Sequence, residues 1–231
     1  MTEDRPVAIV TGATGGMGSE IVRDLVRTHR VYALGRRDDV LSELAVETGA
    51  EARRVDVTDR DALTAFAEEL DRVDVLVHAA AVGGAVSVED ATEADWLLAL
   101  TTNVVGPSLL TRALLPRLRE AEATVVFIGS GASTRPAPGS AVYTASKHAL
   151  RAVADVLRID EEKHRVRVVT IAPGQTDTAM LRAGVPAESY AAERYIRPSS
   201  VAESVRYVVD LPADAHITDI ALRPRQEIAR L

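Results

Sequence analysis

Short apolar runs alternate with longer amphipathic segments along the chain. The apolar runs are dense in valine and isoleucine, as in VAIV at residues 7–10 and TVVFI at residues 124–128, which is typical of strands buried on both faces of a sheet. The longer segments repeat apolar residues at helical spacing. This pattern predicts strands at residues 7–10, 31–34, 52–55, 73–77, 124–128, 166–171 and 217–222, and helices at residues 18–28, 40–48, 59–70, 93–118, 142–163 and 199–210.

The alternation of strands with helices predicts an α/β fold with a doubly wound, Rossmann-type parallel sheet of seven strands and helices on both faces. The length of 231 residues suits one such domain, so we expect residues 1–231 to form a single dinucleotide-binding domain. The connection at residues 172–198 is long and rich in alanine, glycine and proline. Sites in such folds open at the carboxyl ends of the strands, so we expect this connection to be a lid.

The composition narrows the classes of partner. The chain has a net charge of −7, and its arginines are scattered, which argues against binding nucleic acid or an anionic membrane. It has no cysteine, and its five histidines lie far apart, so we expect no disulfide and no metal site. The acidic start MTED and the lack of an 18-residue apolar run favour a cytoplasmic protein without a membrane span. The final tripeptide ARL is similar to a peroxisomal signal, but we interpret it as a chance ending.

The stretch VAIVTGATGGMGSEI runs from the first predicted strand into the first predicted helix. Its glycines, among them Gly12, Gly16 and Gly18, allow a tight turn and a close approach of the backbone to a pyrophosphate at the helix amino terminus. The second strand ends in ALGRRDD, where Gly35 stands at the position of the acid that usually binds a ribose hydroxyl. Arg36 and Arg37 follow it, and a guanidinium suits a 2′-phosphate, so NADP(H) is favoured over NAD(H), with Arg36 as the main contact.

A tyrosine and a lysine lie one helical turn apart in YTASK. Tyr143 and Lys147 share one face of the predicted helix, in a chain that has 25 arginines and only one other lysine, Lys163. A nearby ammonium would lower the pKa of the tyrosine and make it useful for general acid–base catalysis near neutral pH. Arginine cannot replace lysine where a compact point charge is required.

Taken together, these motifs resemble the short-chain dehydrogenase/reductase family. Its pattern T-G-x-x-x-G-x-G fits Thr11, Gly12, Gly16 and Gly18, and the extended subgroup's T-G-x-x-G-x-x-G fits through Gly15. The extended members carry a further substrate domain, for which 231 residues leave no room. The resemblance therefore favours the single-domain subgroup.

The resemblance implies a catalytic set of Asn103, Ser130, Tyr143 and Lys147. Asn103 is the only asparagine in the chain, and Ser130 lies at the end of the fifth predicted strand. Tyr143 would donate the proton, Ser130 would bind the carbonyl oxygen, Lys147 would hold the nicotinamide ribose, and Asn103 would support a water that relays protons to Lys147. The implied cofactor-binding residues are Gly12, Thr14, Gly16, Met17, Gly18, Arg36, Arg37, Asp56, Val57, Ala79, Ala80, Asn103, Tyr143, Lys147, Pro173, Gly174, Thr176 and Thr178.

One motif departs from the family. After the fourth strand the family usually has N-N-A-G, whereas this chain has HAAA from His78 to Ala81. The small residues still allow a close approach of the cofactor, but the asparagine hydrogen bonds that brace the sheet are missing.

We therefore predict an NADP(H)-dependent oxidoreductase that interconverts a carbonyl and a secondary alcohol on a small molecule. The family implies a homodimer or homotetramer that associates through the helices at residues 93–118 and 142–163, the second of which carries a stripe of Ala145, Ala149, Ala152 and Val156. That stripe could equally face its own sheet. Two alternatives stay open, a non-catalytic NADP(H)-sensing protein and an extended-type nucleotide-sugar epimerase or dehydratase.

Overall fold

Every strand of the central sheet runs parallel to its neighbours. The computed structural model describes residues 5–226, and in that range seven strands form one sheet in the order β3-β2-β1-β4-β5-β6-β7. Because β1 pairs with both β2 and β4, the strand order reverses there and opens a crevice at the carboxyl ends of the strands. The predicted fold class is confirmed. The strands are β1 Val7–Thr11, β2 Arg30–Gly35, β3 Glu51–Arg54, β4 Val75–His78, β5 Thr124–Ile128, β6 Arg167–Pro173 and β7 Asp219–Leu222.

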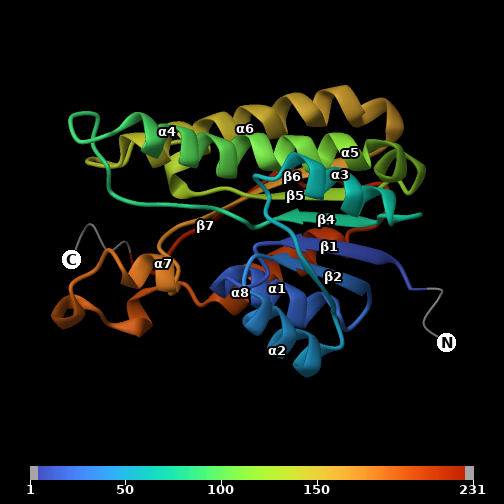
Figure 1. Cartoon of the computed structure of the whole chain (residues 1–231), viewed down its shortest axis with the longest axis horizontal. Coiled ribbons are helices and arrows are strands. Elements are labelled where there is room, and N and C mark those ends of the chain that lie inside the picture. Colours follow the sequence, from blue (N-terminus) through green and yellow to red (C-terminus); the bar gives the residue numbers. More distant parts are fainter. Residues whose placement is uncertain (1–4, 227–231) are drawn as a thin grey trace.

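Helices cover both faces of the sheet (Figure 1). The α-helices are α1 Gly16–Leu25, α2 Asp38–Thr48, α3 Arg60–Glu68, α4 Glu93–Leu100, α5 Gly106–Glu120, α6 Ala141–Glu161, α7 Ala179–Arg182 and α8 Pro198–Val209. Helices α1, α2 and α8 cover one face, and α3, α5 and α6 the other. Strand β1 is buried along its whole length and sends Ala8 and Val10 to the first layer and Val7 and Ile9 to the second. This two-sided burial explains the nearly continuous apolar runs of the strands.

Several element boundaries were predicted wrongly. The helix expected at residues 93–118 is interrupted by a π-helical turn at Thr101–Val105, which separates α4 from α5. The lid expected at residues 172–198 contains α7 and two 3₁₀ turns, Ala187–Ser189 and Ala192–Arg194. The single-domain prediction for residues 1–231 extends beyond the described range and stays a prediction, and the tripeptide ARL also lies outside the described residues.

The continuous helical segment from α4 to α5 is long and apolar. Among the described residues, Glu93–Glu120 is the one helix that could cross a membrane by length and composition alone, although it contains no uninterrupted apolar run of 18 residues. The core helices of soluble proteins meet the same criterion. Here α5 packs Leu110, Leu114 and Leu118 into the layer that covers the sheet, so its apolar residues have a partner within the fold.

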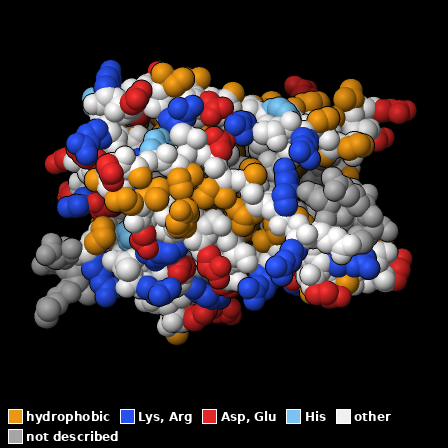
Figure 2. Space-filling model, turned by 180° about the vertical axis from the view of Figure 1, so that it is seen from behind, with side chains coloured by type: hydrophobic (Ala, Val, Ile, Leu, Met, Phe, Trp, Pro, Cys, Tyr) orange, Lys and Arg blue, Asp and Glu red, His pale blue; other side chains and the backbone are white. Residues whose placement is uncertain are grey.

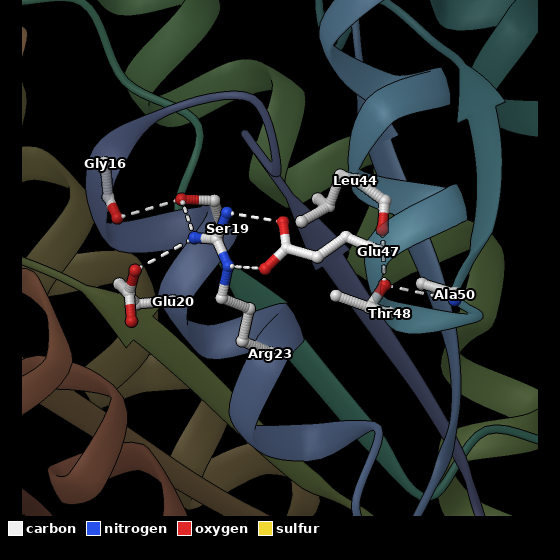
Figure 3. A network of polar contacts seen from close by, with 8 residues as sticks. All are labelled: Gly16, Ser19, Glu20, Arg23, Leu44, Glu47, Thr48 and Ala50. Carbon is white, nitrogen blue, oxygen red and sulfur yellow. Dashed lines mark hydrogen bonds and ion pairs between the residues drawn. The ribbon is translucent and has the colours of Figure 1, made fainter.

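A polar network fixes α1 against α2 behind the glycine turn (Figure 3). The Arg23 guanidinium donates to both carboxylate oxygens of Glu47, at 2.6 and 2.9 Å, and also to Glu20 at 2.9 Å. It reaches Ser19 as well, whose hydroxyl donates to the carbonyl of Gly16 at 3.2 Å. The first turn of α1 is therefore tied to α2, which limits the movement of the loop that precedes it.

Candidate active site

The glycine turn between β1 and α1 leaves no space for side chains at two positions. Gly12 has a φ of +66°, and a Cβ there would lie 2.6 Å from the backbone nitrogen of Ala80. A Cβ at Gly18 would lie 2.2 Å from the carbonyl oxygen of Gly12. A Cβ at Gly16 would meet the Thr178 methyl group at 3.1 Å, so this glycine faces the lid. The turn is thus shaped for a close approach of backbone to a bound group, as a dinucleotide site requires.

A cavity of about 310 Å³ extends from this turn along the carboxyl ends of the strands. It brings together most of the residues expected to bind the cofactor. The predicted residues that line it are Gly12, Thr14, Gly16, Met17, Gly18, Arg36, Arg37, Asp56, Val57, Ala79, Ala80, Tyr143, Lys147 and Thr178.

Four of the residues predicted to bind the cofactor do not line the cavity, and neither does Ser130, which was predicted to be catalytic. Asn103 is fully buried beneath it. Pro173 ends β6, and Gly174 donates its backbone N–H to the carbonyl of Leu222 at 2.8 Å, so both belong to the joint between β6 and β7. The Thr176 hydroxyl donates to the carbonyl of Gly174 at 3.1 Å and is buried.

Sequence reasoning also missed several lining residues. Most of them are small or contribute backbone, and carry no functional group that a motif search could detect. They are Gly15, Gly35, Val55, Ala81, Val82, Thr102, Ile128, Gly129, Ala179 and Met180.

Two arginines lie at one end of the cavity, where β2 ends. The Arg36 side chain is 66% exposed, and its guanidinium is 3.7 Å from the carboxylate of Asp56. Arg37 donates to the backbone carbonyl of Thr14 in the glycine turn. Asp56 accepts from the backbone and the hydroxyl of Thr58, at 2.9 and 2.8 Å. Burial acts to raise the pKa of Asp56, but the bonds from Thr58 and the charge of Arg36 outweigh it and lower that pKa.

Tyr143 and Lys147 line the other end of the cavity, and Ser130, which does not line it, lies next to Tyr143. The Ser130 hydroxyl is hydrogen-bonded to the Tyr143 phenol. Lys147 is 2% exposed; its Nζ donates to the carbonyl of Ile128 at 3.0 Å and lies 5.8 Å from the centroid of the Tyr143 ring. The structure therefore brings together a proton-carrying group, a hydroxyl and an ammonium.

The expected pKa shift of Tyr143 is wrong in direction. We expected the Lys147 ammonium to lower it, but burial raises the pKa of Tyr143 above its usual value, and the bond with Ser130 offsets only part of that rise. Burial also lowers the pKa of Lys147 to about 8. Both groups are desolvated, and the Lys147 ammonium is directed at the Ile128 carbonyl, so desolvation determines both shifts.

Asn103 lies in the π-helical turn and braces the floor of the site. Its Nδ2 donates to the carbonyl of Val82 and to the hydroxyl of Ser146, both at 2.9 Å. Its Oδ1 accepts from the backbone N–H of Val82 at 2.8 Å. The side chain therefore joins the loop after β4 to α6, next to Lys147.

Threonine hydroxyls, in place of asparagine side chains, hold the HAAA motif at residues 78–81. The Thr11 hydroxyl of β1 accepts from the backbone N–H groups of Ala79 and Ala80, both at 3.2 Å. His78 is buried, lies 2.8 Å from the Thr111 hydroxyl through Nε2, and stacks on Phe127. Burial lowers its pKa to about 3, so it is neutral. The asparagine hydrogen bonds of the family are missing, as expected, but Thr11 supplies other hydrogen bonds between β1 and the residues that follow β4.

The segment predicted to be a lid packs beside Tyr143. A Cβ at Gly83 would lie 2.8 Å from the Met180 sulfur and 3.5 Å from Cε2 of Tyr143, so Met180 packs beside the tyrosine. The lid is held by Asp177, which accepts from Arg182 at 2.7 Å and from the Tyr190 hydroxyl at 2.6 Å. Among the described residues, no group of three or more His, Cys, Asp or Glu side chains could hold a metal ion.

Residues 6–189 match the family described as short chain dehydrogenase. The chain belongs to this family. This short-chain dehydrogenase is 32% identical to sulfoacetaldehyde reductase 2 of Chromohalobacter salexigens, over 96% of its own length and 95% of that protein. It is 34% identical to the NADP-dependent 3-hydroxy acid dehydrogenase YdfG of Escherichia coli, over 94% of both chains. Its structure is similar to the closed form of a serine dehydrogenase complexed with NADP+, with a TM-score of 0.85, 32% identity and 94% of each chain covered. The predicted family is confirmed, and this short-chain dehydrogenase is an oxidoreductase of that family.

Proposed function

We propose that the chain is an NADP(H)-dependent oxidoreductase that interconverts a carbonyl group and a secondary alcohol. The observation that carries this proposal is the position of Tyr143. Its phenol is hydrogen-bonded to Ser130 and lies close to Lys147, in the same cavity as a glycine turn without room for side chains. A proton donor and a dinucleotide-binding turn in one cavity suit coupled hydride and proton transfer.

The residues present fit NADP(H). The glycine turn would receive the pyrophosphate, and the two arginines at the end of β2 would receive the 2′-phosphate. That NADP+ is bound in the similar serine dehydrogenase, and that YdfG is named as NADP-dependent, supports this cofactor over NAD(H). We propose that the cofactor is bound by the residues that the family resemblance implied. Of these, Asn103, Pro173, Gly174 and Thr176 do not line the cavity and would support the residues that do.

When bound, NADPH supplies a hydride. Tyr143 holds the proton at neutral pH, since burial raises its pKa, and donates it to the carbonyl oxygen as that oxygen gains charge. Ser130 binds the same oxygen. Lys147, with a pKa of about 8, remains largely protonated at neutral pH and stabilises the phenolate that Tyr143 becomes. The expected part of Asn103 in relaying protons to Lys147 stays a prediction.

A carbonyl screen tests the function. The purified protein with NADPH is given short aldehydes and ketones, and loss of NADPH absorbance is measured. Because the relatives are named for sulfoacetaldehyde and a 3-hydroxy acid, the panel pairs anionic compounds with neutral analogues. We expect the wild-type protein to reduce at least one carbonyl compound, and we expect the Tyr143→Phe variant to have lost this activity. Tight NADPH binding without turnover of any carbonyl would support the sensing alternative instead.

The epimerase or dehydratase alternative makes a different prediction. Such enzymes return the hydride to the substrate, so NADPH would not be consumed while a nucleotide sugar was converted. The chain covers almost the whole length of the reductases it resembles, which supports the single-domain reading. We also propose a homodimer or homotetramer acting on a small molecule, and the cytoplasmic location stays a prediction.

A further inference from the structure

The chain segment after β7 crosses the carboxyl ends of the neighbouring strands. Strand β7 is held to α6 by an ion pair between Arg151 and Asp219 at 3.0 Å. At its other end, the carbonyl of Leu222 accepts from Gly174 at 2.8 Å, and Pro224 is buried, with its Cδ against Gly174. Arg223 lies between these two fixed points. Its backbone is therefore held at the edge of the sheet where sites of this fold open.

The Arg223 side chain extends from there to the residue next to Ser130. A Cβ built on Gly131 would lie 2.4 Å from Nη1 of Arg223 and 3.4 Å from its Cζ. The guanidinium thus rests on the bare Cα of Gly131, in space that any other residue type would fill. Ser130, which precedes it, is hydrogen-bonded to Tyr143. A cation from a distant part of the chain therefore contacts the residue that follows Ser130, outside the lining of the described cavity.

We propose that Arg223 recognises an acidic group of the substrate, a carboxylate or a sulfonate one or two carbons from the reacting carbonyl. A guanidinium binds such a planar or multi-oxygen anion through two parallel hydrogen bonds. Among the charged side chains that line the described cavity, the one acid, Asp56, lies at the opposite end beside Arg36, so it does not repel an anion at Tyr143. This inference rests on the proposed function and names its substrate class.

A second arginine lies close to Ser130 in the sequence but not at this contact. Arg135 follows Ser130 by five residues. In the structure Arg135 is exposed, and its backbone N–H donates to the Gly131 carbonyl at 3.3 Å. The side chain in contact with Gly131 is that of Arg223, which no local motif connects to the site.

The test compares acetoacetate with acetoacetamide, a neutral compound of the same shape, as substrates with NADPH. In the wild type we expect acetoacetate to be preferred. Arg223→Gln should lower kcat/KM for acetoacetate roughly tenfold to hundredfold, through KM, and change that for acetoacetamide less than threefold. For Arg223→Lys, kcat/KM for acetoacetate should lie between the values for the wild type and for Arg223→Gln. Gly131→Ala, whose Cβ displaces the guanidinium, should weaken the preference for the anion. Arg225→Gln and Arg135→Gln remove exposed charges nearby and serve as matched controls that should retain it.

A second measurement separates this inference from the proposed function. Calorimetry follows binding of 3-hydroxybutyrate and 3-hydroxybutanamide to the protein with NADPH, where no turnover is needed. If no carbonyl is reduced but the anion binds in an Arg223-dependent way, the proposed reaction fails and the anion site stands. If Arg223→Gln affects anion and amide equally in both assays, or affects neither, the anion site is wrong even where the reductase activity is present.

Discussion

At the scale of single residues, Lys147 combines complete burial with a specific acceptor. Its Nζ reaches the Ile128 carbonyl at 3.0 Å inside the protein, where a longer, planar guanidinium has no equivalent position. We expect both Lys147→Arg and Lys147→Met to lose at least roughly a hundredfold in kcat while folding, measured by circular dichroism, is retained.

The second lysine provides the matched control. Lys163 is exposed in the turn Glu162–His164, so Lys163→Arg should leave kcat unchanged. Tyr143→Phe should be as inactive as Lys147→Met, and the double variant little worse, because the pair acts as a unit. A Lys147→Arg enzyme with normal turnover from pH 6 to 9 would rule out a catalytic role for the ammonium.

Arg36 is the residue at which the choice of cofactor can be tested. It is largely exposed and near Asp56, so its removal should leave the fold intact. Arg36→Ala should weaken NADPH binding roughly tenfold to hundredfold and leave NADH binding unchanged, since only NADPH carries the 2′-phosphate. Arg27→Ala, an exposed arginine beyond α1, is the control for a lost charge. Equal losses for both cofactors, in a fluorescence titration, would contradict the assignment.

His78 should make stability depend on pH. Its folded pKa of about 3 lies below its ordinary value of 6.5, so between these values the unfolded chain binds the extra proton. Stability therefore rises with pH through this window and is lost as the pH falls below 6.5. From pH 7 to 5 the wild type should lose about 2 kcal/mol of unfolding free energy relative to His78→Asn.

Denaturant unfolding at several pH values measures this difference. His148→Asn, which removes an exposed histidine from α6, should instead follow the wild-type curve. Parallel curves for the wild type and His78→Asn would show that His78 takes up its proton in the folded state as readily as in the unfolded one.

At the scale of elements, the π-helical turn Thr101–Val105 places Asn103 under the site. Asn103→Ala would leave both backbone groups of Val82 and the Ser146 hydroxyl without this partner. We expect a loss of about 3 kcal/mol in unfolding free energy and a marked fall in kcat. Ser108→Ala, which removes a hydroxyl bonded to Val104 within the same helix, should change either quantity little. A fully active, equally stable Asn103→Ala would contradict this bracing role.

The same turn shows what the sequence could and could not predict. The spacing of apolar residues along the chain predicted every strand and most helices. It does so because a strand or helix that is buried on one or two faces carries apolar residues at regular intervals. The π-helical turn places Asn103 in contact with Val82 and Ser146, and no local sequence pattern records these contacts. The residues around Gly12 and Tyr143 could be predicted from the sequence, because glycine turns and Tyr–Lys pairs have recognisable residue types and spacing. Lining residues such as Gly35 and Gly129, and the approach of Arg223 to Gly131, depend on the path of the backbone.

At the scale of the whole molecule, apolar side chains remain on the outer faces of the long helices. Leu97 and Leu98 on α4, and Val156 and Ile159 on α6, are more than half exposed, and Ala145 and Ala152 also face outward. The stripe on α6 therefore faces away from its own sheet. Figure 2 shows hydrophobic side chains gathered across the middle of the rear face of the molecule. Exposed apolar area of this kind is typical of association surfaces.

Light scattering of the purified protein tests the predicted homodimer or homotetramer. Val156→Asp should shift the protein to a smaller species, since it places a charge in the contact between helices. Val46→Asp is the control, because Val46 is 89% exposed but lies on α2, in the other layer. A wild-type monomer at micromolar concentration would remove the prediction.

The position of β1 has a consequence for biosynthesis. It comes first in the chain among the seven strands of the sheet, yet it lies inside the sheet, and its partner β4 begins only at Val75. While the chain is still on the ribosome, the backbone N–H and C=O groups on one edge of β1 are unpaired until β4 has emerged. Parallel strands that must wait for distant partners pair slowly and expose aggregation-prone surface. We therefore expect the nascent chain to be most prone to aggregation before β4 has emerged.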